Sequence, residues 1–108
     1  MNFELEKKWS ELVNSLGQKE GEKPSIDSVI FVIGLQELNM DISKLTKDQK
    51  LEVMHVGLCA IFTPYGYYEP LGRDEEGWIH FKTVKKFPNL NQKEQEEIIK
   101  EAIIEYYK

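Results

Sequence analysis

The sequence contains a single cysteine, Cys59, and a single arginine, Arg73. One cysteine cannot form a disulfide within the chain, which excludes the disulfide-stabilised scaffolds of small secreted domains. The longest apolar run, residues 29–35, is far shorter than the roughly 20 residues that span a membrane. The first residues carry acids where a signal peptide is basic and apolar. We therefore expect a cytoplasmic protein with no membrane partner.

Positive charge is also scarce in this chain. Lysine and arginine number 14 against 19 aspartates and glutamates, which gives a small acidic protein with a net charge of −5. Proteins that bind nucleic acids usually cluster lysine and arginine, and arginine is the better bidentate reader of phosphate and guanine. The composition therefore predicts no nucleic-acid partner.

The familiar catalytic and nucleotide-binding signatures are missing as well. The sequence has no G-x-G-x-x-G, P-loop, G-x-S-x-G, H-E-x-x-H or C-x-x-C pattern. The acidic residues 74–77 lack the alternating ligand spacing of an EF-hand loop. We expect no cofactor and no metal, and we interpret this acidic stretch as a solvated turn.

The 108 residues correspond to one small domain, residues 1–108. Its first predicted helix covers residues 3–16, where apolar side chains recur at three- and four-residue steps. These side chains are Leu5, Trp9, Leu12 and Leu16. Residues 17–24 contain no large apolar side chain, which predicts a solvated linker. Such a linker would leave residues 1–16 as a loosely attached N-terminal helix.

The next two helices are expected to be central. Ser25 is a good N-cap for a helix over residues 26–38. Thr46 and Gln49 have the spacing of a capping box, which begins the next helix, and Pro64 ends that helix. Both helices are apolar nearly all round, which predicts a buried pair. In the second of them, we assign Leu51, Met54, Leu58 and Phe62 to one apolar face and Val53, Val56 and Ala60 to the other.

Aromatic and β-branched residues on either side of the acidic turn predict a β-hairpin over residues 65–84. A last helix, residues 92–106, begins at a capping box formed by Asn91 and Glu94. The fold class is therefore α+β and mostly helical, with four helices and one hairpin between the third and the fourth. This order resembles that of winged-helix proteins, whose third helix reads DNA. A recognition helix needs a polar, usually basic face, whereas most of the last three turns of the third helix here are apolar.

The hairpin aromatics are the most unusual local feature. Tyrosine and tryptophan are favoured at interfaces because they bury a large area and keep one polar contact. The alternative is that these rings pack the hairpin against the helices. Adjacent strand residues face opposite ways, so either Tyr67 or Tyr68 should point outward. The predicted interaction residues are Tyr65, Tyr67, Tyr68, Trp78 and His80.

A second candidate is the pair formed by His55 and Cys59, one turn apart on the third helix. An imidazolium lowers the pKa of a neighbouring thiol, which can create a nucleophile or a ligand site. The competing interpretation is a hydrogen-bonded core histidine beside a packed thiol, because helical spacing places His55 between Leu51 and Leu58. We favour the core interpretation, because no third residue can be named that would orient the pair.

Three functions from different classes follow. We expect a non-enzymatic protein-interaction module: an adaptor, an immunity-like partner or an accessory subunit of a larger complex. Its partner would be another protein or a second copy of the chain, docked on the hairpin or on the first helix. The alternative is a small enzyme or ligand-binding domain that uses His55 and Cys59. The second alternative is a winged-helix-like nucleic-acid binder, for which Lys82, Lys85 and Lys86 beside aromatic residues are the only support.

Overall fold

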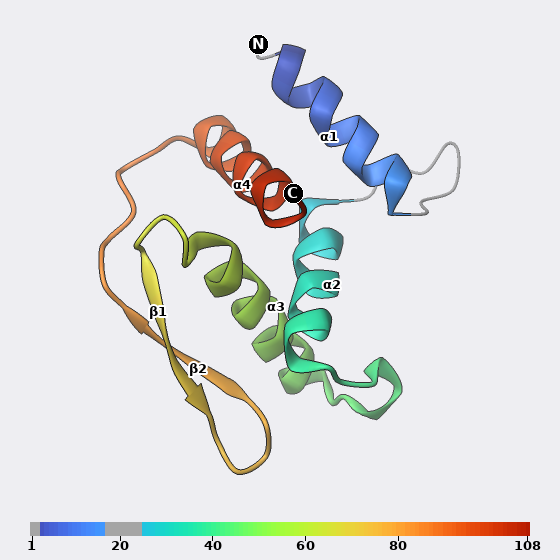
Figure 1. The fold of residues 1–108 in the computed structure, drawn as a ribbon, viewed down its shortest axis with the longest axis vertical. Coiled ribbons are helices and arrows are strands. Elements are labelled where there is room, and N and C mark those ends of the chain that lie inside the picture. Colours follow the sequence, from blue (N-terminus) through green and yellow to red (C-terminus); the bar gives the residue numbers. More distant parts are fainter. Residues whose placement is uncertain (1–2, 17–24) are drawn as a thin grey trace.

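Figure 1 shows a computed structural model of the chain, which describes residues 3–16 and 25–108, with the backbone alone at residue 42. The elements in chain order are α1 (Phe3–Ser15), α2 (Ile26–Leu38), the short 3-10 helix η1 (Ile42–Lys44), α3 (Lys47–Phe62), β1 (Tyr68–Arg73), β2 (Ile79–Thr83) and α4 (Gln92–Tyr106). Within the described residues, the predicted mostly helical α+β fold is confirmed, with four α-helices and one antiparallel hairpin between α3 and α4. The predicted linker, residues 17–24, lies outside the described residues.

Helices α2, α3 and α4 begin at the caps that the sequence predicts. The Ser25 hydroxyl accepts a first-turn backbone N–H at 3.1 Å. At the start of α3, the Thr46 hydroxyl accepts the N–H of Gln49 at 3.2 Å, and the Gln49 side chain accepts the N–H of Thr46 at 2.9 Å. Asn91 and Glu94 form the same reciprocal pair at the start of α4. These bonds satisfy backbone donors that have no partner inside a helix.

The α2–α3 pair is held in close contact by two glycines. A Cβ atom added to Gly34 would overlap the carbonyl oxygen of Val53, and one added to Gly57 would overlap that of Ile30. Only glycine therefore allows the two helix backbones to approach this closely. Although α2 is apolar nearly all round, no described helix is long and apolar enough to cross a membrane.

Two clusters of buried side chains form the core, and α2 and α3 contribute to both. The first cluster unites all four α-helices and contains Trp9, Val13, Val29, Ile30, Ile33, Ile61, Phe62, Ala102 and Ile103. The second contains Leu38, Val53 and Val56, and the hairpin covers it with Trp78, Ile79 and Phe81. Helices α2 and α3 are therefore central, as predicted.

The sequence misplaced one residue of the α3 face. Leu51 was expected on the same apolar face as Leu58, but it is 65% exposed. Leu58 itself is only half-buried, whereas Val53 and Val56, on the other predicted face, are buried. Both faces of α3 are apolar in sequence, so helical periodicity alone could not decide which one α2 and the hairpin would cover.

Helix α1 packs beside α4, as Figure 1 shows. Its Leu5, Trp9 and Val13 side chains are buried. At the edge of this contact, the Lys100 ammonium lies 2.8 Å from a Glu6 carboxylate oxygen and 5.6 Å from the centroid of the Trp9 ring. Of the predicted apolar stripe, Leu5 and Trp9 are thus buried within the chain, and Leu12 and Leu16 are half-buried.

The hairpin is joined to the end of α2 through Glu37. One Arg73 guanidinium nitrogen donates to the Glu37 carbonyl oxygen at 2.6 Å, and the other donates to the Gly77 carbonyl at 2.9 Å. The Tyr106 hydroxyl of α4 donates to the Glu37 carboxylate at 2.5 Å. Burial and the neighbouring Glu37 carboxylate raise the pKa of Tyr106, so this phenol stays protonated as a donor. Three elements therefore meet at one residue.

Candidate functional site

The five predicted interaction residues divide between the two ends of the hairpin. Tyr65, Tyr67 and Tyr68 lie at its base, where the chain leaves α3, and Trp78 and His80 lie near its tip. Tyr65 is 43% exposed and His80 is also exposed. Neither Tyr67 nor Tyr68 points fully outward, because both are half-buried against the first core cluster.

At the base, aromatic rings pack around Phe62, the buried last residue of α3. The rings of Tyr67 and Phe87 are stacked, with centroids 4.3 Å apart and planes 5° from parallel. Phe87 also meets Phe62 edge to face at 4.7 Å. Such ring pairs add about 0.5–1.5 kcal/mol each beyond the area they bury. They fix the base of the hairpin on the end of α3.

Lys85 covers this aromatic group from outside. Its ammonium lies 4.3 Å from the centroid of the Tyr67 ring and 3.5 Å from the Tyr65 carbonyl oxygen. The neighbouring Val84 donates its N–H to the Tyr67 carbonyl at 2.9 Å, so the chain on both sides of the hairpin base is tied together.

Apolar side chains at this base remain in contact with solvent. Val84 is 55% exposed and Phe87 is 38% exposed, next to the exposed Lys85 and Lys86. We define the basal patch as Tyr65, Val84, Lys85, Lys86 and Phe87. Val84 and Phe87 were not among the interaction residues predicted from the sequence, whereas Lys85 and Lys86 were named there only as weak support for nucleic-acid binding. The signal that could have found them is their position: both residues follow β2, so they lie outside the alternation that half-buries Ile79 and Phe81.

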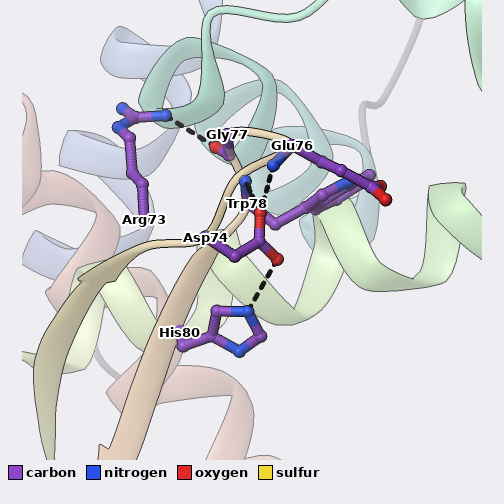
Figure 2. A network of polar contacts seen from close by, with 6 residues as sticks. All are labelled: Arg73, Asp74, Glu76, Gly77, Trp78 and His80. Carbon is purple, nitrogen blue, oxygen red and sulfur yellow. Dashed lines mark hydrogen bonds and ion pairs between the residues drawn. The ribbon is translucent and has the colours of Figure 1, made fainter.

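The hairpin tip is organised by the Asp74 carboxylate, shown in Figure 2. One oxygen accepts the backbone N–H groups of Glu76 and Trp78, at 2.9 and 3.0 Å. The other oxygen lies 2.8 Å from Nε2 of His80. The His80 hydrogen bond, followed by that of the Trp78 N–H, lowers the pKa of Asp74 below its usual value. The acidic turn predicted from sequence is thus an ordered turn closed by its own carboxylate.

A groove of about 410 Å³ separates this tip from the start of α3, and both histidines line it. His55 enters from α3 and His80 from β2, with Glu52 and Asp74 beside them. Within the described residues, no group of three or more histidine, cysteine, aspartate or glutamate side chains is placed to hold a metal ion. The groove brings together residues that the sequence left far apart, without assembling a metal-binding set.

The expectation that His55 is a core residue is wrong, because it is exposed. Its Nε2 lies 3.5 Å from the Cys59 sulfur, so the predicted pair is in contact. Cys59 is fully buried, and burial raises the pKa of its thiol to about 11. A thiol with this pKa carries almost no thiolate near neutral pH, and the thiolate is the nucleophilic form. The burial of Cys59 therefore disfavours a nucleophilic role for the pair.

The exposed side of α3 carries charges of both signs near its N-terminus. Lys47 and Lys50 alternate there with Asp48 and Glu52, and all four are exposed. The hairpin packs against the same helix instead of projecting from it. This arrangement differs from the basic recognition face that a winged-helix protein presents to DNA.

Comparison of this chain with models of protein families, with curated proteins and with solved structures gives no match.

Proposed function

We propose that this chain is a non-catalytic protein-interaction module that docks through its basal patch. The observation that carries the proposal is the concentration of exposed apolar side chains around the hairpin. Among the described residues, the large exposed hydrophobic side chains in residues 65–87 are Tyr65, Leu71, Val84 and Phe87. Large apolar side chains left in solvent beside one another favour a contact with another protein.

The scaffold below the patch supports this proposal. The rings of Tyr67 and Phe87 are stacked on each other and packed against buried Phe62. An aromatic anchor held in one orientation loses little conformational freedom when a partner binds, so more of its contact energy appears as affinity. Residues of this kind tend to dominate binding energies at interfaces.

The other regions that were predicted to interact support docking less well. Trp78 is half-buried against the second core cluster, and its backbone N–H donates to the Asp74 carboxylate. Tyr68 is half-buried, and burial is the main cause of the raised pKa of its hydroxyl. We therefore interpret these two side chains mainly as packing that holds the hairpin in place.

Affinity capture with matched baits tests the proposal. The full chain is immobilised as wild type and as Val84→Ser, with Leu51→Ser as the control. Leu51 is even more exposed than Val84, at 65% against 55%, but it lies on α3 and outside the basal patch. We expect the wild-type bait and the Leu51→Ser bait to retain the same protein, and the Val84→Ser bait to lose it.

Melting temperatures of all three baits must agree, so that loss of binding reports the surface and not the fold. A second copy of the chain, supplied with a different tag, distinguishes self-association from binding of another protein. Equal capture by the wild-type and Val84→Ser baits would contradict docking through the basal patch.

A further inference from the structure

We infer that the segment bound by the basal patch is a short acidic peptide of a protein partner, with an apolar side chain among its carboxylates. This inference rests on the proposed function and names the chemistry of the partner. It follows from the charge of the patch, from the apolar groups beside that charge, and from the Tyr67 ring, on which Phe87 is already stacked.

The positive charges of the patch are not neutralised by the described part of the chain. Neither Lys85 nor Lys86 forms an ion pair with a described residue, whereas Lys100 and Lys108 pair with Glu6 and Glu105. Lys86 is exposed, and the Lys85 ammonium rests on the Tyr67 ring. No described carboxylate of the chain pairs with these two ammonium groups, so a carboxylate of a partner can pair with either of them.

The apolar groups flank these two adjacent charges along the chain. Val84 precedes Lys85, and Phe87 follows Lys86 directly. Both apolar side chains are more than a third exposed. A peptide with carboxylates alone would leave Val84 and Phe87 in water, so an apolar side chain next to the carboxylates completes the fit.

The α4 side of the patch carries charges of both signs. The pKa of Tyr65 is raised by burial and then by the nearby carboxylates of Glu105 and Glu101 on α4, and it is lowered by Lys108. Lys108 is paired with Glu105 at 2.7 Å. The lysines without a described ion pair therefore lie on the side of Lys85 and Lys86, which favours that side for the bound carboxylates.

The Tyr67 ring beneath the patch is unsuited to stacking with the bases of a single-stranded nucleic acid. Base stacking needs a free aromatic face. Phe87 is stacked on Tyr67, and the Lys85 ammonium lies 4.3 Å from the centroid of the same ring. The net charge of −5 also repels a long polyanion along its whole length, whereas a short peptide senses mainly charges within a Debye length of about 8 Å.

Fluorescence anisotropy with defined probes tests the inference on the full chain. The first probe is a labelled peptide of about ten residues, short enough to sample mainly local charge, with glutamates on both sides of one phenylalanine. The second replaces that phenylalanine with alanine. A labelled oligothymidylate and vesicles containing phosphatidylserine are the competing polyanions.

We expect the phenylalanine peptide to bind about tenfold more tightly than the alanine peptide, because one buried ring is exchanged for a methyl group. Lys86→Glu should weaken its binding by about fivefold, because an attractive surface charge becomes repulsive. The matched control is Lys50→Glu, which makes the same charge change on an exposed lysine of α3 and should leave the affinity unchanged.

Equal losses in Lys86→Glu and Lys50→Glu, tighter binding of oligothymidylate or vesicles, or no peptide binding would each overturn the inference. The proposed function fails separately, in the capture experiment. If capture depends on Val84 while no acidic peptide binds, the docking surface stands and the acidic partner is wrong. If neither capture nor peptide binding depends on the patch, the proposed function and the acidic partner are both wrong.

Discussion

Arg73, at the end of β1, donates from its guanidinium to the carbonyl oxygen of Glu37, in the last turn of α2. These two residues are separated by more than thirty positions, and their contact joins the hairpin to the central helix pair. Helix carbonyls in the last turn lack a partner inside the helix, so a cation placed there satisfies the acceptor and opposes the helix dipole. The only arginine of the sequence thus has a structural role near the hairpin tip.

Arg73→Ala should destabilise the fold by about 1 kcal/mol, because two hydrogen bonds from a charged but exposed donor are lost. Urea unfolding measures the difference. Lys82→Ala removes an exposed charge from the paired strand and should cost much less. Equal effects of the two substitutions would mean that the contact with Glu37 does not hold the hairpin.

Gly57→Ala should destabilise by about 1–3 kcal/mol, the usual cost of overpacking, although alanine is the better helix former by about 1 kcal/mol. The added methyl group would overlap the Ile30 carbonyl and force α2 away from α3. Ser10→Ala, on the exposed side of α1, is the control and should be neutral or slightly stabilising. A gain of stability in Gly57→Ala would show that the helices are not packed this closely.

The stability of the chain should decrease in acid, partly through Asp74. Its pKa is lower in the folded chain than in the unfolded chain, so its stabilising contribution is present above the unfolded value of about 3.9. That contribution is lost as the pH falls through the folded pKa. Asp74→Asn should make the free energy of unfolding less dependent on pH in this range, as urea unfolding at a series of pH values measures. An unchanged pH profile in Asp74→Asn would contradict the carboxylate-closed turn.

Cys59 should react slowly with thiol reagents in the folded chain. Its sulfur is buried, and the pKa of its thiol is raised to about 11. At pH 8 we expect labelling to require unfolding, so the rate should rise steeply with denaturant. Rapid labelling of the folded chain would restore the pair of Cys59 and His55 as a candidate nucleophile.

The sequence predicted the elements of this fold because their signals are local. Capping residues such as Thr46 and Asn91 determine where a helix begins, and their hydrogen bonds lie within one turn. The hairpin was predicted for the same reason, from apolar strands on either side of a turn that Asp74 closes.

The exposed surface could not be predicted in the same way, because exposure depends on which elements come together. Leu51 and Val53 are both apolar residues of α3, yet one is exposed and the other is fully buried. The basal patch depends on the return of Phe87 to the end of α3, where it meets Phe62 after a long separation in sequence. The periodicity of apolar residues within one helix or strand cannot predict that contact, because the two residues belong to different segments.

Photo-crosslinking shows whether the chain docks through the basal patch. A benzophenone side chain is placed at position 84 of the full chain, and separately at positions 3 and 51, where Phe3 and Leu51 are also well exposed. We expect one discrete adduct with a partner protein from position 84 and little from the other two, and unlabelled wild-type chain should compete with its formation. An adduct formed from position 3 on α1, with none from position 84, would contradict docking through the basal patch and would place the docking surface beside α1 instead.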